Sequence, residues 1–299
     1  MKPRGEESLK SSGAPAKARV FPSKSGWGTR WLSFLRDYIL AGAGVLYMFT
    51  AGLFQARHRI FLQGVVRHLG WREDPAQAPP PVKLPSVSLN SVLNPAHEIC
   101  LIEAEECYGN VSTLELAVIN SLVRARRPEA IFEIGTFDGR TTLNLAANAP
   151  PNARVLTLDL PAELPDGTAF ELDENDRVYI QKPEPGTRFK GNPLSKRIVQ
   201  LRGDSATFDY TPFWGQMELV FVDGSHSYVY VLNDSNIAMR LLGQRGIIIW
   251  HDYGCDCEGV TRALNELFGS RPELKNLKHI RGTRLAYLET GIGASSADV

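Results

Sequence analysis

Residues 130–142, Ala-Ile-Phe-Glu-Ile-Gly-Thr-Phe-Asp-Gly-Arg-Thr-Thr, decide how the rest of the chain is interpreted. Residues 130–134 form a short apolar run that is typical of a buried parallel strand. Gly135 and Gly139 then bracket a tight loop, and a helical pattern begins at Thr141. Because a glycine-rich turn between a strand and a helix lets a ligand approach the backbone, this stretch predicts a binding loop.

The spacing of this loop differs from that of dinucleotide-binding loops. Dinucleotide folds use Gly-x-Gly-x-x-Gly, whereas residues 133–141 read Glu-x-Gly-x-x-x-Gly-x-Thr. We expect the carboxylate of Glu133 to point toward the loop, where it would repel a pyrophosphate but suit a ligand that carries an ammonium group. The plainer alternative is an ordinary strand–turn–helix whose glycines serve geometry only.

The overall composition describes a globular chain without a global charge bias. In 299 residues, 33 Lys and Arg balance 33 Asp and Glu, which gives no reason to expect nucleic-acid binding. The length allows one large α/β domain plus an appendage. The four cysteines form no disulfide framework and no Cys-x-x-Cys pair, so we expect a reducing, cytoplasmic compartment. Two of them, Cys255 and Cys257, are expected to occupy a loop rather than hold zinc.

The first third of the chain differs in composition from the rest. Residues 1–30 are rich in Lys, Arg, Ser, Gly and Pro and predict a disordered basic tail. Residues 31–72 predict an apolar or amphipathic helical segment. Residues 73–90 contain five prolines, which favour extended backbone and predict a linker. The main domain is therefore expected to cover residues 91–299.

Residues 38–54 within the helical segment carry no charge over 17 positions. At a rise of ~1.5 Å per residue they fall a little short of a ~30 Å hydrocarbon core. A secretory signal is disfavoured because the apolar run starts so far into the chain. A marginal membrane span, an interfacial anchor, and a helix buried on the domain or on a partner subunit of a homo-oligomer all stay open. Flanking basic residues favour contact with a membrane surface through residues 31–72.

Strands and helices alternate after the linker. The expected strands are residues 130–134, 155–158, 198–201, 219–222 and 247–250, and the expected helices are residues 112–126, 141–148, 229–242 and 259–268. Ser112 and Glu115 predict a capping box at the first of these helices. Such alternation predicts a doubly wound parallel sheet, in which ligands gather at the carboxyl ends of the strands.

Polar residues stand where these strands end. Asp159, some 20 residues past the glycine loop, suits hydrogen bonds to ribose hydroxyls. Asp204 follows the third strand and could accept a hydrogen bond from an adenine amine, with Ser205 beside it. Asp223 and Asp252 follow the fourth and fifth strands, so we expect both carboxylates to face one crevice.

Two histidines, His226 and His251, accompany these last two aspartates. Two carboxylates and two imidazoles around a crevice can hold a divalent cation, or one imidazole can act as a general base. The plainer alternative is that the histidines cap helices or satisfy buried carbonyl groups.

The order of these motifs resembles that of the class I S-adenosylmethionine-dependent methyltransferases. The resemblance narrows to the methyltransferase 24 type through Asp-Gly-x-His-Ser-Tyr at residues 223–228 and His-Asp-Tyr at residues 251–253. This type is similar to macrocin and catechol O-methyltransferases and to cephalosporin-hydroxylase-like proteins. The resemblance covers residues 108–290. It implies an α/β fold with a doubly wound, mostly parallel seven-stranded sheet, the Rossmann-like methyltransferase fold, here with a helical N-terminal appendage.

The resemblance also implies a role for each matched position. The cofactor would be S-adenosylmethionine, its methionine end lined by Glu133, Gly135, Thr136, Phe137, Gly139 and Thr141, its ribose by Asp159, and its adenine by Asp204 and Ser205. Asp223 would face both cofactor and acceptor. His226 matches the position of the base in macrocin-type enzymes. Asp223, His251 and Asp252 match the catalytic positions that hold Mg²⁺ in metal-using relatives, although an imidazole suits Mg²⁺ poorly and leaves the metal open.

Residues 160–197 form a connection far longer than such folds need. Their basic side chains predict either a lid that favours a polar or anionic acceptor or a solvated excursion. Taken together, the sequence predicts an enzyme that methylates a hydroxyl group of a small molecule or glycan. The alternatives are a non-catalytic scaffold at a membrane and another enzyme, hydroxylase-like or nicotinamide-dependent, on the same fold.

Overall fold

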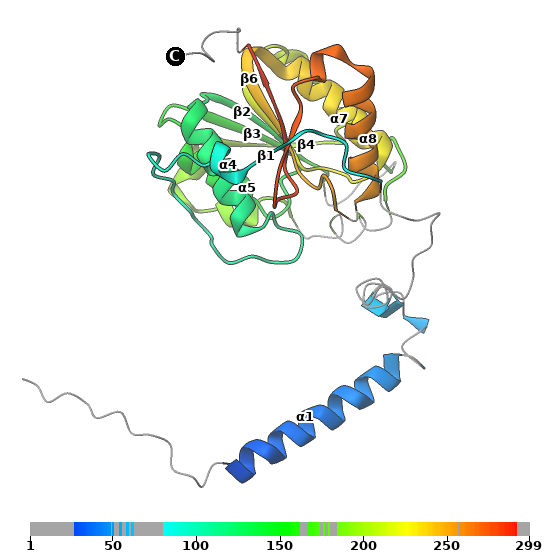
Figure 1. Cartoon of the computed structure of the whole chain (residues 1–299). Coiled ribbons are helices and arrows are strands. Elements are labelled where there is room, and N and C mark those ends of the chain that lie inside the picture. Colours follow the sequence, from blue (N-terminus) through cyan, green and yellow to red (C-terminus); the bar gives the residue numbers. More distant parts are fainter. Residues whose placement is uncertain are drawn as a thin grey trace, which may run out of the picture. The chain divides into compact units, whose positions relative to one another are not determined.

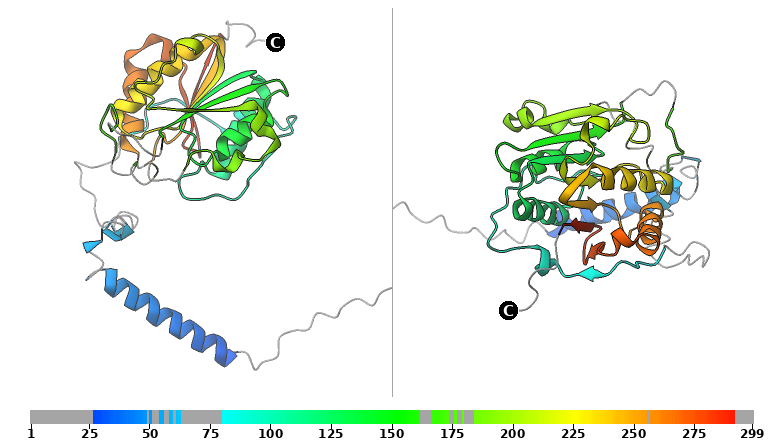
Figure 2. Two further views of the ribbon diagram at one scale, coloured as in Figure 1. Left: turned by 180° about the vertical axis from the view of Figure 1, so that it is seen from behind. Right: turned by 90° about the horizontal axis from the view of Figure 1, so that it is seen from above.

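The computed structural model describes residues 27–48, 50, 54–55, 58–59, 61–62, 80–161, 167–173, 176, 179, 184–255 and 257–291. The chain divides into two compact units, residues 1–78 and residues 79–299, and each is described by itself. In the second unit a single sheet separates two layers of helices (Figures 1 and 2).

The described strands form one eight-stranded sheet in the order β1-β7-β8-β6-β5-β2-β3-β4. They are β1 (Ser86–Val87), β2 (Ala130–Ile134), β3 (Arg154–Asp159), β4 (Ile198–Arg202), β5 (Met217–Val222), β6 (Leu242–Trp250), β7 (Lys278–Ile280) and β8 (Ala286–Thr290). Only β8 runs antiparallel to its neighbours, β6 and β7. The doubly wound, mostly parallel sheet is therefore confirmed, with eight strands rather than seven because the two-residue β1 pairs with β7 at the edge.

The helices of the second unit have almost the predicted limits. They are α3 (Leu89–Val92), α4 (Thr113–Arg126), α5 (Arg140–Asn148), α7 (Tyr228–Leu241) and α8 (Glu258–Ser270), with short 3-10 turns at Thr187–Phe189, Pro193–Arg197, Thr211–Phe213 and Pro272–Leu274. The predicted capping box is present, since the Ser112 side chain accepts from the Glu115 backbone N–H and Glu115 Oε2 accepts from the Ser112 N–H at 3.0 Å. Reciprocal capping satisfies two backbone donors and explains why α4 begins at Thr113.

Two hydrophobic cores hold the helices on the two faces of the sheet. Residues of β2 alternate between them: Ile131 packs in the core with α4 and α5, and Phe132 packs in the core with α7 and α8. Trp250 of β6 lies in the second core and is 1% exposed. Burial on both faces explains the near-continuous apolar runs that identify these strands in the sequence.

The predicted linker ends earlier than residue 90. The backbone N–H groups of Lys83 and Leu84 both donate to the Tyr253 hydroxyl, at 2.9 and 3.0 Å, and the Leu84 side chain is buried. Residues 80–90 therefore belong to the second unit and supply β1 to its sheet. Proline content alone could not reveal that the last residues of this stretch are fixed by a buried hydroxyl group.

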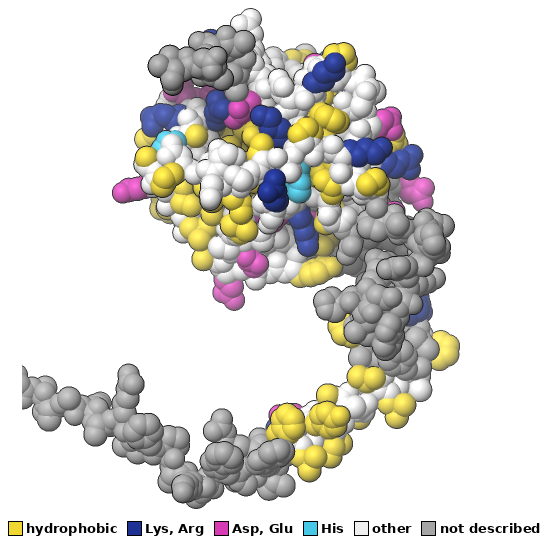
Figure 3. Space-filling view, viewed as in Figure 1, with side chains coloured by type: hydrophobic (Ala, Val, Ile, Leu, Met, Phe, Trp, Pro, Cys, Tyr) yellow, Lys and Arg dark blue, Asp and Glu magenta, His cyan; other side chains and the backbone are white. Residues whose placement is uncertain are grey.

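The first unit contains α1 (Trp27–Met48). Residues 27–30, which the composition assigns to a disordered tail, form its first turn, and residues 1–26 lie outside the described residues. From residue 34 to residue 47 every side chain of α1 is exposed, and many are apolar (Figure 3). No helix among the described residues is long and apolar enough to span a bilayer. Most of residues 49–79 lies outside the described residues.

Candidate functional site

The glycine loop after β2 packs directly against the backbone that follows β5. Gly135 has φ +99°, and a Cβ atom at this position would lie 1.9 Å from the carbonyl oxygen of Asp223. The Asp223 N–H donates to the Ile134 carbonyl at 2.8 Å, which fixes the two segments together. Glycine is thus required at position 135 because the backbone of Asp223 approaches it closely. This contact brings the loop next to the aspartate that follows β5.

The second half of the loop is held by the long insertion. Gly139 caps α5 with φ +86°, and a Cβ on it would lie 2.6 Å from the buried Phe189 ring. The Phe137 N–H donates to Asp159 Oδ2 at 2.7 Å, so the carboxylate at the end of β3 lies at the loop as predicted. Thr136 is buried, and Thr141 is half-buried on α5.

Glu133 stands just before the loop, and its side chain lies in the interior. Its side chain is fully buried, and Oε2 accepts hydrogen bonds from the hydroxyls of Thr142 and Thr157, the latter at 2.5 Å. Its other oxygen, Oε1, has no hydrogen-bond partner among the residues that the structure describes. Burial raises the pKa of Glu133 to about 8 despite these hydroxyl donors, so the group is a neutral acid near pH 7. Its predicted contact with an ammonium group stays a prediction.

Asp204 and Ser205, which are predicted to contact adenine, form hydrogen bonds with other residues of the protein. Asp204 is buried and accepts from the N–H groups of Ala169 and Ala206 and from the Tyr230 hydroxyl, at 2.7 to 2.8 Å. The Ser205 side chain hydrogen-bonds to Asp234. An adenine amine would have to share or replace these donors.

The residues after β5 and β6 meet, as their strand positions predict. His251 Nδ1 lies 3.0 Å from Asp223 Oδ1 and 3.1 Å from Asp252 Oδ2. The other ring nitrogen, Nε2, lies 3.3 Å from Glu115 Oε2. Burial opposes the charged ring, but the adjacent carboxylates raise the pKa of His251 well above its ordinary value. His251 is therefore an imidazolium that joins three carboxylates.

His226 occupies an equivalent place between two carboxylates. Its Nε2 lies 2.8 Å from Asp252 Oδ2, and its Nδ1 is bonded to Asp176, which also accepts from the His226 backbone N–H at 3.0 Å. Burial favours the neutral ring, but the hydrogen bonds to Asp176 and Asp252 raise the pKa of His226 to about 11. We call the six residues Glu115, Asp176, Asp223, His226, His251 and Asp252 the acid–imidazole cluster.

Two members of this cluster were not anticipated as site residues. Glu115 is recognisable in the sequence only as a capping residue, yet its carboxylate also accepts from the Arg284 N–H and faces His251. Asp176 comes from the long insertion, where no local pattern marks it. Cys257 is not a member of the cluster but lies beside it, since its Sγ lies within 4.8 Å of a ring nitrogen of His226 and a carboxylate oxygen of Asp252.

The basic residues of the insertion are engaged within the domain. Arg188 pairs with Asp138 at 2.7 Å and with Glu103 at 3.2 Å. Lys190 pairs with Glu184, and Arg197 donates to the Pro150 carbonyl at 2.7 Å. Arg188 and Arg197 therefore fasten the insertion to the rest of the domain, and the Lys190 pair lies within the insertion. These contacts are a different use from the predicted attraction of an anionic acceptor. Lys182 lies outside the described residues.

Several solved structures are similar to this chain at low identity. The SAH-bound methyltransferase PaMTH1 of Podospora anserina has a TM-score of 0.46 and 16% identity, over 61% of this chain and 80% of that one. The O-methyltransferase TomG of Streptomyces achromogenes, in complex with SAM, has a TM-score of 0.41 and 18% identity, over 64% and 93%. An O-methyltransferase of Bacillus cereus, in complex with SAH, has a TM-score of 0.43 and 17% identity, over 62% and 84%. No curated protein matches the sequence.

A protein-family model agrees with the motifs read from the sequence. Residues 132–253 match the Methyltransf_24 family, described as a methyltransferase domain. The matched segment contains the glycine loop and five of the six residues of the acid–imidazole cluster, all but Glu115. Residues 132–253 are therefore similar to a methyltransferase domain, as the motifs in this segment predict.

Proposed function

We propose that this chain uses S-adenosylmethionine to methylate a hydroxyl oxygen of a small molecule or glycan. The matched methyltransferase family supports methyl transfer as the reaction class. The observation that carries the proposal is the contact of Gly135 with the Asp223 carbonyl, where a Cβ atom would lie 1.9 Å away. Because of this contact, a methyl donor held at the loop would lie beside the acid–imidazole cluster, which supplies groups able to orient a hydroxyl and to handle its proton.

The residues around the loop fit a cofactor with a ribose and an ammonium group. Asp159 stands at the end of β3 and touches the loop through the Phe137 N–H. Oε1 of Glu133 is a buried acceptor to which no described residue donates. Leaving such an atom unsatisfied costs ~1–3 kcal/mol, which a ligand donor reaching it would recover. A cationic donor there would also lower the pKa of Glu133 and restore the carboxylate.

The reaction itself is a displacement in line at carbon. The acceptor oxygen attacks the methyl carbon, the carbon–sulfur bond breaks, and its electron pair stays on sulfur. The acceptor hydroxyl gives its proton to His226 when that ring is neutral. Since the sulfonium already activates the methyl group, positioning of the acceptor supplies much of the rate. In this account Asp223 and Asp252 orient the acceptor at the carboxyl ends of β5 and β6.

The charge state of His226 constrains its role as the base. Both ring nitrogens face carboxylates, and a pKa of about 11 keeps the ring protonated at neutral pH. An imidazolium cannot accept the acceptor's proton. His226 therefore acts as a base only after one of its carboxylate partners has been neutralised or drawn away by a cation or by substrate.

Transfer of a labelled methyl group tests the proposal. The full chain is incubated with methyl-labelled S-adenosylmethionine and sets of phenols, sugars and other hydroxyl compounds, and products are detected by mass spectrometry. We expect a methyl ether product. Asp159→Asn should weaken cofactor binding because it removes a charged acceptor at the expected ribose position. Asp209→Asn, a change at an aspartate outside the site, is the matched control.

The result also separates the alternatives. Saturable cofactor binding without a methylated product from any hydroxyl class would favour the non-catalytic scaffold over an enzyme. Binding of NAD in place of S-adenosylmethionine would favour a nicotinamide-dependent enzyme on the same fold. Products methylated on nitrogen or carbon alone would contradict O-methylation while leaving methyl transfer intact.

A further inference from the structure

We propose that His226, Asp252 and Cys257 bind a zinc ion at the carboxyl end of β6. The site itself is inferred from the geometry of these three side chains, whereas its role in activating an acceptor hydroxyl rests on the proposed function. A bound zinc ion lowers the pKa of a hydroxyl that coordinates it.

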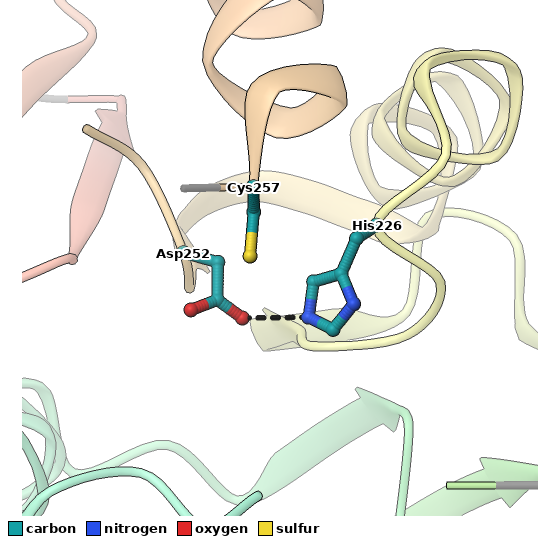
Figure 4. A group of neighbouring side chains, drawn as sticks. All are labelled: His226, Asp252 and Cys257. Atoms are coloured by element: carbon teal, nitrogen blue, oxygen red, sulfur yellow. Dashed lines mark hydrogen bonds and ion pairs between the residues drawn. The ribbon is translucent and has the colours of Figure 1, made fainter. Parts of the chain in front are cut away.

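Three side chains from three separate segments converge at this point (Figure 4). His226 precedes α7, Asp252 follows β6, and Cys257 caps the start of α8. One ligand atom from each lies within 4.8 Å of the other two, and the Cys257 Sγ points toward the 2.8 Å hydrogen bond between His226 Nε2 and Asp252 Oδ2. An ion among them would replace that hydrogen bond with coordination at about 2.0–2.3 Å.

The far side of the His226 ring is arranged as in metal-bound histidines. Its Nδ1 is bonded to Asp176, which also accepts from the Ser225 hydroxyl at 2.5 Å and from the His226 N–H. Metal-ligating histidines almost always donate their second ring N–H to a carboxylate, carbonyl or water, which fixes the tautomer and orients the ring. Asp176 thus directs the Nε2 lone pair toward Asp252 and Cys257.

The ligand chemistry identifies the ion. Thiolate and imidazole suit zinc, whereas magnesium takes oxygen ligands. Three protein ligands with an open fourth position are the usual arrangement of a catalytic zinc site. The side chains of His226 and Asp252 are 17% and 9% exposed and Cys257 is half-buried, so the three side chains are not sealed in the core.

A second possible ligand set shares one member with this site. Asp223, His251 and Asp252 also bring ligand atoms within 4.8 Å, but they contain no thiol. Because both sets use Asp252, they compete for that carboxylate. The thiol distinguishes them experimentally, and it reverses the expectation that Cys257 merely occupies a loop.

Cobalt substitution of the full-length chain tests the assignment. Cobalt(II) bound to a thiolate gives a charge-transfer band in the near ultraviolet, and zinc should displace it. We expect this band and stoichiometric zinc in the wild type, and loss of both in Cys257→Ser. Cys100→Ser changes an exposed thiol and should keep the band. Asp176→Asn should weaken zinc binding by ~10–100-fold because it loosens the ring orientation.

A measurement without mutation guards against misfolded variants. Zinc should protect Cys257 of the wild type from alkylation, as read by peptide mapping, while the exposed Cys100 and Cys107 react equally with and without zinc. Absence of both the band and the protection would overturn the site. Loss of the band in Cys255→Ser but not in Cys257→Ser would overturn the choice of thiol. A cation site abolished by His251→Asn but indifferent to Cys257→Ser would replace it with the oxygen-rich set.

The zinc site and the proposed function can fail separately. S-adenosylhomocysteine binding is measured on metal-free and zinc-loaded protein. Binding of S-adenosylhomocysteine by a protein that takes no zinc would refute the site alone. Zinc binding with no affinity for S-adenosylmethionine or S-adenosylhomocysteine would refute the methyltransferase proposal and leave the site standing.

Discussion

Glu133 carries a carboxyl group that is fully buried in the fold. Two threonine hydroxyls stabilise one oxygen, yet burial dominates and raises the pKa to about 8. The imidazoles of the cluster show the opposite balance, because each lies between carboxylates and retains its proton. At the scale of single residues, the same low-polarity interior thus neutralises an isolated acid and preserves charge where acid and base are paired.

The titration of Glu133 predicts a pH-dependent stability. The unfolded acid ionises near 4.5 and the folded one near 8. Between these values only the unfolded state loses its proton, so the free energy of unfolding should fall as pH rises, by about 1.4 kcal/mol per pH unit from this group. Glu133→Gln should remove that decline in ligand-free protein, as measured by denaturant unfolding from pH 5 to 8. Glu273→Gln, at an exposed carboxylate, should not, and equal slopes in Glu133→Gln and wild type would contradict the assignment.

Removal of the His226 ring should reduce turnover rather than cofactor binding. The imidazole bridges Asp176 and Asp252, so His226→Ala leaves two carboxylates facing each other without a cation between them. We expect kcat to fall at least ~10²-fold, with S-adenosylhomocysteine affinity little changed. His97→Ala, outside the cluster, should keep full activity. A fully active His226→Ala enzyme with the same acceptor would exclude a role of His226 in catalysis.

The elements of the site are joined by close backbone contacts between loops. The loop after β2 touches the loop after β5 at Gly135, and the insertion covers the same loop through Phe189 at Gly139. The insertion also delivers Asp176 to His226. At the scale of elements, the carboxyl ends of β2, β3, β5 and β6 therefore act as one assembly, because a displacement of any loop is transmitted by direct contact to the next.

Two glycine substitutions separate steric contact from backbone strain. Gly135 and Gly191 both have positive φ, at +99° and +74°, but a Cβ meets the Asp223 carbonyl only at Gly135, whereas nothing lies within 4 Å of it at Gly191. Gly135→Ala should therefore lower the free energy of unfolding by more than ~1 kcal/mol beyond Gly191→Ala. Chemical denaturation of both variants measures the difference. Equal losses would mean that the loops are not in contact in solution.

The whole molecule combines a helical N-terminal unit with a second unit whose residues 132–253 match a methyltransferase family model. Along α1 the exposed apolar side chains include Phe34, Leu35, Tyr38, Ile39, Leu40, Val45, Leu46 and Tyr47. A helix that exposes so much apolar surface is stabilised by a partner surface. We propose a lipid interface as that surface, in keeping with the basic residues that follow the apolar run.

Vesicle binding tests this proposal for the N-terminal unit. The full chain should sediment with vesicles rich in anionic phospholipid, and the chain without residues 1–72 should stay in the supernatant while keeping its thermal melting temperature. Higher salt should weaken the binding because part of it is electrostatic. Equal sedimentation of both proteins would show that the contact with lipid does not depend on this unit.

Much of the domain could be predicted from sequence because its strands are apolar and α4 begins with a capping box. The alternation from Ala130 to Trp250 predicts the sheet, and the strand-end rule predicts that Asp223, His251 and Asp252 meet. What could not be predicted depends on distant partners. Asp176 reaches His226 from 50 positions away, and the Tyr253 hydroxyl fixes residues 83 and 84 from the other end of the domain. The pattern of apolar residues also does not show that the hydroxyls of Thr142 and Thr157 donate to the carboxylate of Glu133 and enclose it.

Calorimetric titration with S-adenosylmethionine and S-adenosylhomocysteine tests the central claim most directly. The account predicts saturable, one-site binding of both to the full-length protein, weakened by Asp159→Asn, and no comparable binding of NAD. Absence of binding for both ligands at millimolar concentration, in protein shown to be folded, would contradict it.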